Sequence, residues 1–518
     1  MAQISYAGMH LDVARLEGVR SLLDERLSGQ VEELLREPKR RELLKLDRDG
    51  NLILTRKGKV PSLSQGRLRA MLASAADEVS RDSGRPFAAP RTPKGLVSLK
   101  AEEWEELAPF HPLVHAWIEL GRTTKMLQFF RDLDGPVIHP SYRPLVRTGR
   151  TSCSGPNVQQ LPRKGGLREA FVASPGHLLL AVDYSFIELR TLAAECEARY
   201  GSSKLADVIR AGTDPHCHSA AIFAGITLEK FMALKMSAVA GKRERFETLR
   251  QRAKVLNFGI PGGLGPRSLV AYAKSTYGVA LSLEDAARFR LRLIEEVYPE
   301  LGRYLADDGM EILARNLDVP VDACWSTFDW KGDRSGAVAG GIRNVVRGRT
   351  HKADGQPYQP GYLRKAWDGL NELNRNPSLV PLLASRVGGD DLQGRLFRAG
   401  VTTLTGRVRG RVGFTQARNT PFQGLAADGA KLALWALSRA RYRVVAFIHD
   451  EVLIELPEDA DHAAEAASVA GIMEKEMERV TGGVPVATEY ALCRRWSKDA
   501  KAVFSRGGRL LPWEDRRR

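Results

Sequence analysis

Cysteine is scarce in this chain, with five among 518 residues and no two of them in a Cys-x-x-Cys pair. A scattered, odd-numbered set argues against a disulfide framework and favours reduced thiols. The run His216-Cys217-His218 resembles the start of a zinc site, but no second ligand cluster follows at a compatible spacing. We therefore expect neither disulfides nor structural zinc.

Long apolar runs are also missing, since none approaches the roughly 20 residues that a membrane-spanning helix needs. The opening residues Met1-Ala2-Gln3-Ile4-Ser5 do not have the pattern of a secretory signal. With 43% hydrophobic and 27% charged residues, the composition is typical of globular proteins. We expect a cytoplasmic protein of several subdomains without membrane association.

Acidic residues are too few to balance the basic ones. Lys and Arg number 78 against 62 Asp and Glu, so the net charge is +16, and the pI is near 9.7. This excess favours a polyanionic partner through counterion release. Net charge alone does not distinguish DNA, RNA and an acidic membrane.

Two distant apolar segments each end in a carboxylate. Asp183 follows the run 177–182, and Asp450 follows the run 444–448 after one histidine. Acids at the ends of buried strands usually have a cation or a hydrogen-bond partner, because desolvating them is costly. Side by side, the two would bind one or two Mg²⁺ ions through oxygen ligands. Each segment alone is equally consistent with a core strand that ends in a solvated turn.

Between the two acids, Arg250, Lys254 and Phe258 recur at a spacing of four residues. Helical geometry places them on one face, where the cations suit a triphosphate and the ring suits a nucleobase. The alternative is a solvated helix face with one aromatic turned to the core. The Gly-rich run 260–265 follows a helix rather than a strand and lacks a Gly-Lys-Ser/Thr ending, so a phosphate-binding loop is not favoured.

This order of a carboxylate strand, a cationic helix and a carboxylate hairpin resembles the family A DNA polymerases, which include bacterial DNA polymerase I and many phage enzymes. Residues 183–190 are similar to the family's motif Asp-Tyr-Ser-Gln-Ile-Glu-Leu-Arg, with Phe186 in place of Gln. Arg250, Lys254, Phe258 and Gly259 fit the second motif, and His449-Asp450-Glu451 fits the third.

Shorter segments extend the resemblance. Residues 148–150 with 156–159, and residues 419–424, resemble primer-template contact segments, and 214–216 resembles the start of the fingers. The chain departs from the family at Gly262, where a tyrosine beside the templating base is usual, so fidelity is not carried over. Residues 318–400 also match nothing in the compact bacterial fingers, and the Gly- and Arg-rich stretch 330–361 within them predicts a loop or arm.

The resemblance implies an α+β, right-hand polymerase fold, with a palm of antiparallel sheet plus helices, helical fingers and a helical thumb. The implied regions are a thumb-like part, a first palm part, fingers with an inserted basic Gly-rich segment, and a second palm part with the His-Asp-Glu hairpin: 1–135, 136–204, 205–400 and 401–518. We expect a polymerase module without an exonuclease domain, in the cytosol of a bacterium or a phage-infected host.

The implied activity is extension of a primer 3′-OH with dNTPs by a DNA-directed DNA polymerase in replication or repair, without proofreading. It needs two Mg²⁺ ions, with Mn²⁺ able to substitute. The implied partners are primer-template DNA, dNTPs, and a separate exonuclease or processivity factor.

By resemblance, the site residues fall into four groups. The catalytic set is Asp183, Asp450, Lys254 and Glu451, and the metal ligands are Asp183, Asp450 and the backbone carbonyl of Tyr184. The dNTP-binding set is Arg250, Lys254, Phe258, Glu188, His216 and Tyr184. The DNA-binding set is Arg150, Asn157, Gln159, Asn419, Gln423 and His449.

Lys254 is expected to protonate the leaving pyrophosphate, and Glu188 to act as a steric gate against a 2′-hydroxyl. An ion pair between Glu188 and a nearby arginine such as Arg190 is the alternative. Two other functions stay open. A single-subunit RNA polymerase has the same architecture, although Glu188 argues against it. A catalytically silent DNA-binding scaffold would not need Asp183, Asp450 and Lys254 together.

Overall fold

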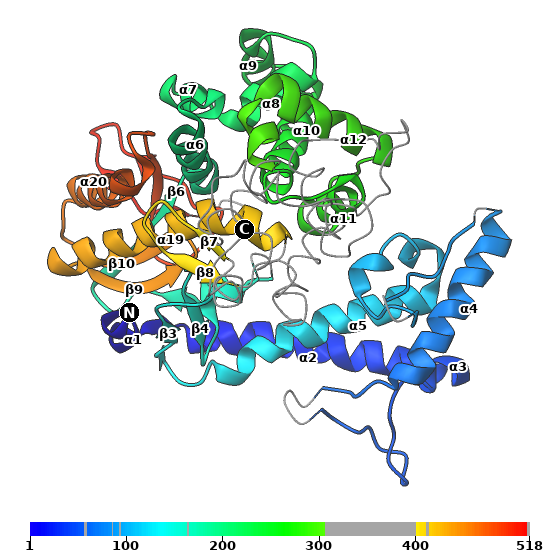
Figure 1. Cartoon of the computed structure of the whole chain (residues 1–518). Helices are drawn as coiled ribbons and strands as arrows, with labels where there is room; N and C mark the ends of the chain where they lie inside the picture. The colour runs from blue at the N-terminus through cyan, green and yellow to red at the C-terminus, as the bar shows by residue number, and fades with distance from the viewer. Residues whose placement is uncertain are drawn as a thin grey trace, which may run out of the picture.

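The computed structural model describes residues 1–55, 60–84, 86–92, 95–162, 165–305, 400–410 and 414–514. Within these ranges a central sheet lies between a long helical arm and a second group of helices (Figure 1). The predicted loop or arm at 330–361, and nearly all of the 318–400 insertion, lie outside the described residues.

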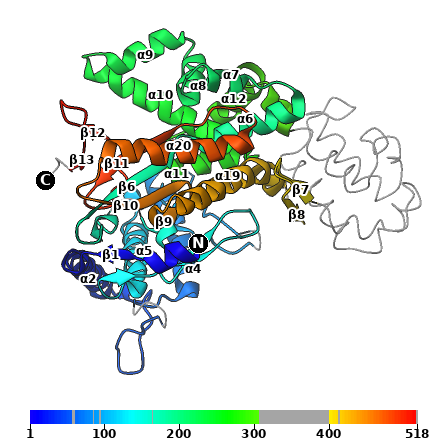
Figure 2. The same cartoon turned by 90° about the vertical axis from the view of Figure 1, so that its left-hand side faces the viewer.

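The central sheet has four antiparallel strands in the order β11-β6-β10-β9. These strands are β6 (His177–Tyr184), β9 (Arg443–Ile448), β10 (Glu451–Pro457) and β11 (Thr488–Cys493). Strands β6 and β10 are buried along almost their whole length, which accounts for their continuous apolar sequences. Helices α19 (Phe414–Arg439) and α20 (His462–Thr481) pack against each other and against the sheet (Figure 2).

The first residues of the chain pack with this sheet. Helix α1 (Ala2–Ala7) contacts β9. Strand β1 (Met9–Leu11) pairs with β2 (Val137–Ile138) and β5 (Phe171–Val172). The apolar side chains of this segment belong to the same core as the sheet. The predicted thumb-like region 1–135 therefore includes a short segment whose apolar side chains share the core of the central sheet.

A long helical arm follows, built from α2 (Val13–Arg36), α3 (Pro38–Arg41), α4 (Gln65–Ser83) and α5 (Pro112–Phe129). It has a core of its own that includes Leu34, Leu72 and the fully buried Trp104. Asp12 caps α2 by accepting a hydrogen bond from the Arg15 amide. Between α3 and α4 the chain forms isolated antiparallel bridges, such as Leu44 with Leu63.

The second helical group lies on the other side of the sheet (Figure 1). Its members are α6 (Ile187–Tyr200), α7 (Lys204–Arg210), α8 (Pro215–Phe223), α9 (Leu228–Met236), α10 (Ala240–Gly259), α11 (Pro266–Tyr277) and α12 (Leu283–Arg292). Leu189 and Leu192 of α6 share a core with Val255 and Leu256 of α10. Helix α6, expected in the palm, thus joins the sheet to these helices.

Three two-stranded sheets complete the described structure. They are β3 (Ser141–Arg143) with β4 (Ser152–Ser154), β7 (Gly400–Thr402) with β8 (Val408–Gly410), and β12 (Val503–Phe504) with β13 (Leu510–Leu511). All strand pairs between named strands are antiparallel, and the helices are segregated from the sheet. The predicted α+β class is confirmed.

Candidate active site

The two acids that end the apolar segments meet at one edge of the central sheet. Strand β10 runs antiparallel to β6 with Glu451 opposite Asp183. The β9–β10 hairpin closes through the pair Ile448 and Glu451, so His449 and Asp450 form its turn. His449 takes a left-handed conformation with φ 62°. This register brings Asp450 to the end of β6.

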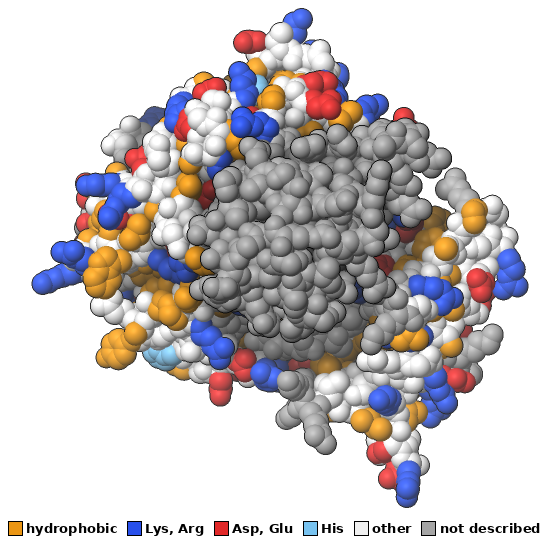
Figure 3. All heavy atoms as spheres, viewed as in Figure 1, with side chains coloured by type: hydrophobic (Ala, Val, Ile, Leu, Met, Phe, Trp, Pro, Cys, Tyr) orange, Lys and Arg blue, Asp and Glu red, His pale blue; other side chains and the backbone are white. Residues whose placement is uncertain are grey.

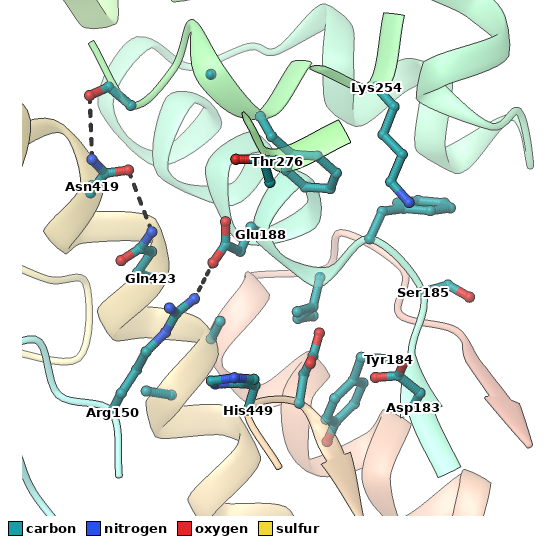
Figure 4. Close-up of a pocket in the computed structure, with 18 of the residues that line it drawn as sticks. Arg150, Asp183, Tyr184, Ser185, Glu188, Lys254, Thr276, Asn419, Gln423 and His449 are labelled. Atoms are coloured by element: carbon teal, nitrogen blue, oxygen red, sulfur yellow. Dashed lines mark hydrogen bonds and ion pairs between the residues drawn. The ribbon is translucent and has the colours of Figure 1, made fainter. Parts of the chain in front are cut away.

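A cavity of about 1350 Å³ opens at this edge. It is bordered by the end of β6, the start of α6, the helices α10, α11 and α19, and the hairpin turn (Figure 4). Most of the predicted site residues line it: Asp183, Asp450, Arg250, Lys254, Phe258, Glu188, His216, Tyr184, Arg150, Asn419, Gln423 and His449. The structure thus brings together segments that are up to 300 residues apart.

The negative charge of Asp183 acts on Asp450. Burial, together with the negative charge of Asp183, raises the pKa of Asp450 to about 7. Asp183 accepts a hydrogen bond from Lys498 Nζ at 2.6 Å through Oδ2, whereas its Oδ1 is buried and has no hydrogen-bond partner in the described part of the chain. A buried carboxylate oxygen without a donor suits a cation.

These oxygens fit a hard divalent cation such as Mg²⁺, which binds through one or two carboxylates and takes other ligands from water and phosphates. Within the described ranges no group of three or more His, Cys, Asp or Glu side chains is arranged for metal binding. A cation between Asp183 and Asp450 would therefore need further oxygen ligands, which water molecules can supply.

The raised pKa of Asp450 predicts how stability depends on pH. Between pH 4 and 7 the folded protein binds this proton more tightly than the unfolded chain, so the contribution of Asp450 to stability falls as pH rises. We expect Asp450→Asn to stabilise the metal-free protein at pH 8 by on the order of 4 kcal/mol, from about three pKa units. The advantage should shrink toward zero as pH falls to 4.

Thermal melts in EDTA at pH 5, 6.5 and 8 measure this effect for wild type and Asp450→Asn. Asp459→Asn, on the exposed far side of the hairpin, is the matched control and should show no such trend. A stabilisation by Asp450→Asn that does not change with pH would contradict the assignment.

The contacts of Glu451 argue against its being a direct metal ligand. It is only 3% exposed, and its Oε1 accepts from Trp496 Nε1 at 3.2 Å while its Oε2 accepts from Lys498 Nζ at 3.0 Å. Both oxygens are therefore engaged by the segment that follows β11. If Glu451 supports the metal site as predicted, it would do so indirectly, by holding Lys498. Neither the spacing nor the motifs of the sequence indicated this lysine.

Arg250, Lys254 and Phe258 of α10 line the same cavity as the two acids, and Lys254 lies across it from Asp183 (Figure 4). Arg250 pairs with Asp214, its Nη2 lying 2.6 Å and its Nε 3.0 Å from Oδ2. Burial opposes the charge of Arg250, but Asp214 outweighs it and raises the pKa of the guanidinium. Asp214 also caps α8 by accepting from the His216 amide. This carboxylate orients Arg250, a role that the sequence did not reveal.

Aromatic rings form one wall. His216 lies between Phe186 and Phe258, with ring centroids 6.2 and 5.2 Å away. Burial lowers the pKa of His216 to about 3, so its imidazole is neutral at physiological pH. Phe186, the departure from the family motif, has φ 38° and lies under the Arg190 guanidinium at 4.4 Å.

Glu188 lies in the first turn of α6 and forms an ion pair with Arg150 (Figure 4). The alternative partner, Arg190, is not the one observed. Arg190 instead donates to the backbone carbonyls of Ser185 and Pro485. A predicted DNA contact and the predicted steric gate therefore touch each other in the absence of ligands.

Polar side chains of α19 also line the cavity. Asn419 Nδ2 donates to the Gly262 carbonyl at 3.3 Å, and Gln423 Nε2 donates to Asn419 Oδ1 at 3.4 Å. A Cβ atom at position 262 would lie 2.9 Å from Asn419 Oδ1. The glycine that replaces the family tyrosine thus lets α19 approach the end of α10. Lys431 Nζ donates to the Gly149 carbonyl, and burial lowers its pKa to about 8.

Two predicted DNA contacts are not brought into the cavity. Gln159 is 7% exposed and donates to Thr151 Oγ1 at 2.9 Å and to the Phe447 carbonyl at 3.2 Å. Asn157 has a buried Oδ1. The Gln159 amide thus joins this segment to strand β9, and a DNA contact by either residue stays a prediction.

On the face shown in Figure 3, the basic side chains of the described residues are interspersed with acidic ones and form no continuous patch. Among the helices that the structure describes, none is both long enough and apolar enough to cross a membrane.

A sheet with paired acids, placed between two helical groups and facing a cationic helix, defines the right-hand polymerase architecture. The POL domain of Pol1 from M. smegmatis, solved in complex with a DNA primer-template and dNTP, superimposes with a TM-score of 0.56 at 18% identity, covering 96% of this chain and 68% of that one. This likeness confirms the predicted fold.

Sequence comparison finds similarity to one family of polymerases. Residues 64–312 match DNA polymerase family A. DNA polymerase I of Aquifex aeolicus is 26% identical over 428 residues, which are 79% of this chain and 55% of that protein. The thermostable DNA polymerase I of Thermus thermophilus is 26% identical over 422 residues, 78% of this chain and 38% of that protein. The chain is thus similar to DNA polymerase family A over residues 64–312, and it spans about half or less of the length of these relatives.

Proposed function

We propose that this chain is a DNA-directed DNA polymerase that extends a primer 3′-OH with dNTPs, in bacterial or phage DNA replication or repair. The observation that carries the proposal is the placement of Asp183 and Asp450 at one edge of a large cavity, with Arg250 and Lys254 of α10 on its other wall. Nucleotidyl transfer requires carboxylates that bind metal ions and cationic side chains that bind the triphosphate.

The donor set of the site supports divalent cations. Asp183, Asp450 and the backbone carbonyl of Tyr184 would hold two Mg²⁺ ions, with Mn²⁺ able to replace them. Bound there, Mg²⁺ would act as a Lewis acid that lowers the pKa of the primer hydroxyl and stabilises the pyrophosphate leaving group.

The side chains of α10 would bind the incoming nucleotide. Arg250, held in place by Asp214, would neutralise phosphate charge, and Lys254 would donate a proton to the leaving pyrophosphate. Phe258 would pack on the base or sugar, next to the neutral imidazole of His216. The structure favours a hydrogen-bonding role for His216 over an electrostatic one, because the pKa of this imidazole is far below 7.

The opposite wall would receive the primer-template. Arg150, Asn419, Gln423 and His449 line the cavity there, and Lys431 adds a cation from α19. By the same proposal, the helical arm from α2 to α5 is the thumb, the central sheet with α19 and α20 is the palm, and the helices from α7 to α12 belong to the fingers.

Primer extension on a DNA template, first with dNTPs and then with rNTPs, tests the proposal. Extension with dNTPs and little extension with rNTPs is the expected result. Equal use of both would favour a single-subunit RNA polymerase. DNA binding without extension under either condition would favour a catalytically silent scaffold.

We also propose that the chain itself does not proofread, so that error correction would need a separate exonuclease. The expected result is that a mismatched primer terminus keeps its length when incubated with Mg²⁺ and without dNTPs. Gel electrophoresis of an end-labelled primer measures it, and a matched primer is the control. Shortening that persists in Asp183→Ala would show a second active site and would overturn this part of the proposal.

A further inference from the structure

The segment after β11 brings a lysine into the acid cluster. Lys498 Nζ lies 2.6 Å from Asp183 Oδ2 and 3.0 Å from Glu451 Oε2, so one ammonium group bridges two carboxylates on neighbouring strands. The contact is between residues 315 and 47 positions apart in the chain. Lys498 also lines both the large cavity and a second one of about 460 Å³.

Trp496 fixes the position of this lysine. The Trp496 ring is fully buried, packs edge-on against Phe171 with centroids 5.7 Å apart, and lies 4.4 Å from the Arg168 guanidinium. Its Nε1 donates to Glu451, the residue that also accepts from Lys498. A lysine two residues from such an anchor has little freedom to leave the carboxylates.

The surrounding charge explains why a cation is needed there. Asp183 faces Glu451 on one neighbouring strand and Glu489 on the other. Asp450 and Glu188 lie close enough to act electrostatically on the same group of acids. Closely spaced carboxylates repel one another, and an ammonium placed among them offsets this repulsion.

We propose that Lys498 is the internal counter-cation of the metal-binding carboxylates and positions Asp183 for the metal, an inference that rests on the proposed polymerase function. By holding Oδ2, Lys498 leaves Oδ1, the buried oxygen without a donor, as the one presented to a metal ion. Lys498 thereby fixes the orientation of Asp183, and its positive charge weakens the attraction of the acids for a metal ion.

Removing the ammonium group of Lys498 should strengthen metal binding but slow catalysis. Without the ammonium, a divalent ion meets less repulsion and more uncompensated negative charge, so it should bind more tightly. Asp183 should then be free to rotate, so the rate of the chemical step should fall. A lysine that only stabilised the fold would change neither quantity in this pattern.

Mn²⁺ binding to the full chain, measured by electron paramagnetic resonance without DNA or nucleotide, tests the proposal. We expect Lys498→Met to lower the Kd for Mn²⁺ by about tenfold. Lys498→Arg, which keeps the charge, should stay near wild type. Lys501→Met is the matched control, since Lys501 is exposed, belongs to the same segment and borders only the second cavity.

Steady-state primer extension supplies the second readout. Lys498→Met should lower kcat about tenfold and leave KM for dNTP within about twofold, because Lys498 acts through Asp183 and Glu451. A Kd for Mn²⁺ within twofold of wild type in Lys498→Met would overturn the proposal. If Lys498→Met does not fold, as shown by circular dichroism, Lys498→Gln removes the charge while keeping a donor and replaces it in both assays.

The same experiment separates this inference from the proposed function. Loss of Mn²⁺ binding in Asp450→Ala together with an unchanged Kd in Lys498→Met would reject the role of Lys498 alone. Unchanged Mn²⁺ binding in Asp450→Ala would reject the metal site of the proposed polymerase, and with it the inference.

Discussion

Asp450→Ala is expected to lower the rate of primer extension by about a thousandfold or more, while the affinity for primer-template DNA changes only a few fold. The hairpin register places this carboxylate beside Asp183 at the cavity edge. Removing it would delete a cation ligand that acts in the transition state. A loss of about 4 kcal/mol of transition-state stabilisation corresponds to roughly a thousandfold in rate. Asp183→Ala should have the same effect, because the proposed site needs both oxygen donors.

Single-turnover extension of a labelled primer measures the rate, and fluorescence anisotropy with the same DNA measures binding. Asp459→Ala is the matched control, because this exposed aspartate lies at the other end of β10. The control should keep the wild-type rate. Near wild-type extension by Asp450→Ala would show that the acids of the hairpin turn do not carry the chemistry.

The elements that position the site were predictable because their signals are local. The apolar runs that became β6 and β9 specify strands by composition, and their flanking acids specify what the strand ends present. The four-residue spacing of Arg250, Lys254 and Phe258 specifies one helix face, which lines the cavity. These patterns need no knowledge of the tertiary structure.

The partners of these residues were not predictable, because they depend on contacts that leave no pattern. Asp214 reaches Arg250 from 36 positions away, and Lys498 reaches Asp183 from 315 positions away. Each is one charged residue among many, and only the folded chain distinguishes it. The sequence therefore predicted most of the groups that line the cavity but not the groups that hold them in place.

Burial explains the other differences. Gln159 resembles a DNA contact by its place in a motif, but it lies in a short 3₁₀ turn (Val158–Gln160) and its amide donates to a carbonyl of β9. Strand β1 has three residues, too few for an alternating pattern to stand out, yet it ties the start of the chain to the palm. Short elements that gain their stability from tertiary contacts carry weak local signals.

The structure adds the most detail to the prediction that Glu188 selects the sugar of the incoming nucleotide. Glu188 lies in the first turn of α6, shortly after β6, lines the cavity, and is close enough to raise the pKa of Asp450 by its charge. Its carboxylate is held by Arg150 from the opposite wall. A carboxylate fixed in this way cannot swing aside to admit a 2′-hydroxyl, so the ion pair should strengthen exclusion rather than replace it.

We expect the wild type to prefer dNTP over rNTP by roughly a hundredfold or more. Glu188→Ala is therefore expected to raise the efficiency of rNTP incorporation relative to dNTP by at least about tenfold. The efficiency with dNTP should fall much less, because the phosphate-binding side chains of α10 are untouched. Values of kcat/KM for dCTP and CTP opposite a template guanine, in wild type and variant, give the ratio.

Arg150→Met separates the two contributions to this gate. It keeps the Glu188 carboxylate but removes the group that holds it, so the preference for dNTP should weaken by less than in Glu188→Ala. DNA affinity should also fall in Arg150→Met and not in Glu188→Ala, because only Arg150 is a proposed DNA contact. If the ratio of dCTP to CTP efficiency is unchanged in Glu188→Ala, Glu188 is not the gate. If only Arg150→Met changes this ratio, sugar selection depends on the primer-template wall. A gate formed by the Glu188 carboxylate held by Arg150 would need both residues, so both variants would change the ratio.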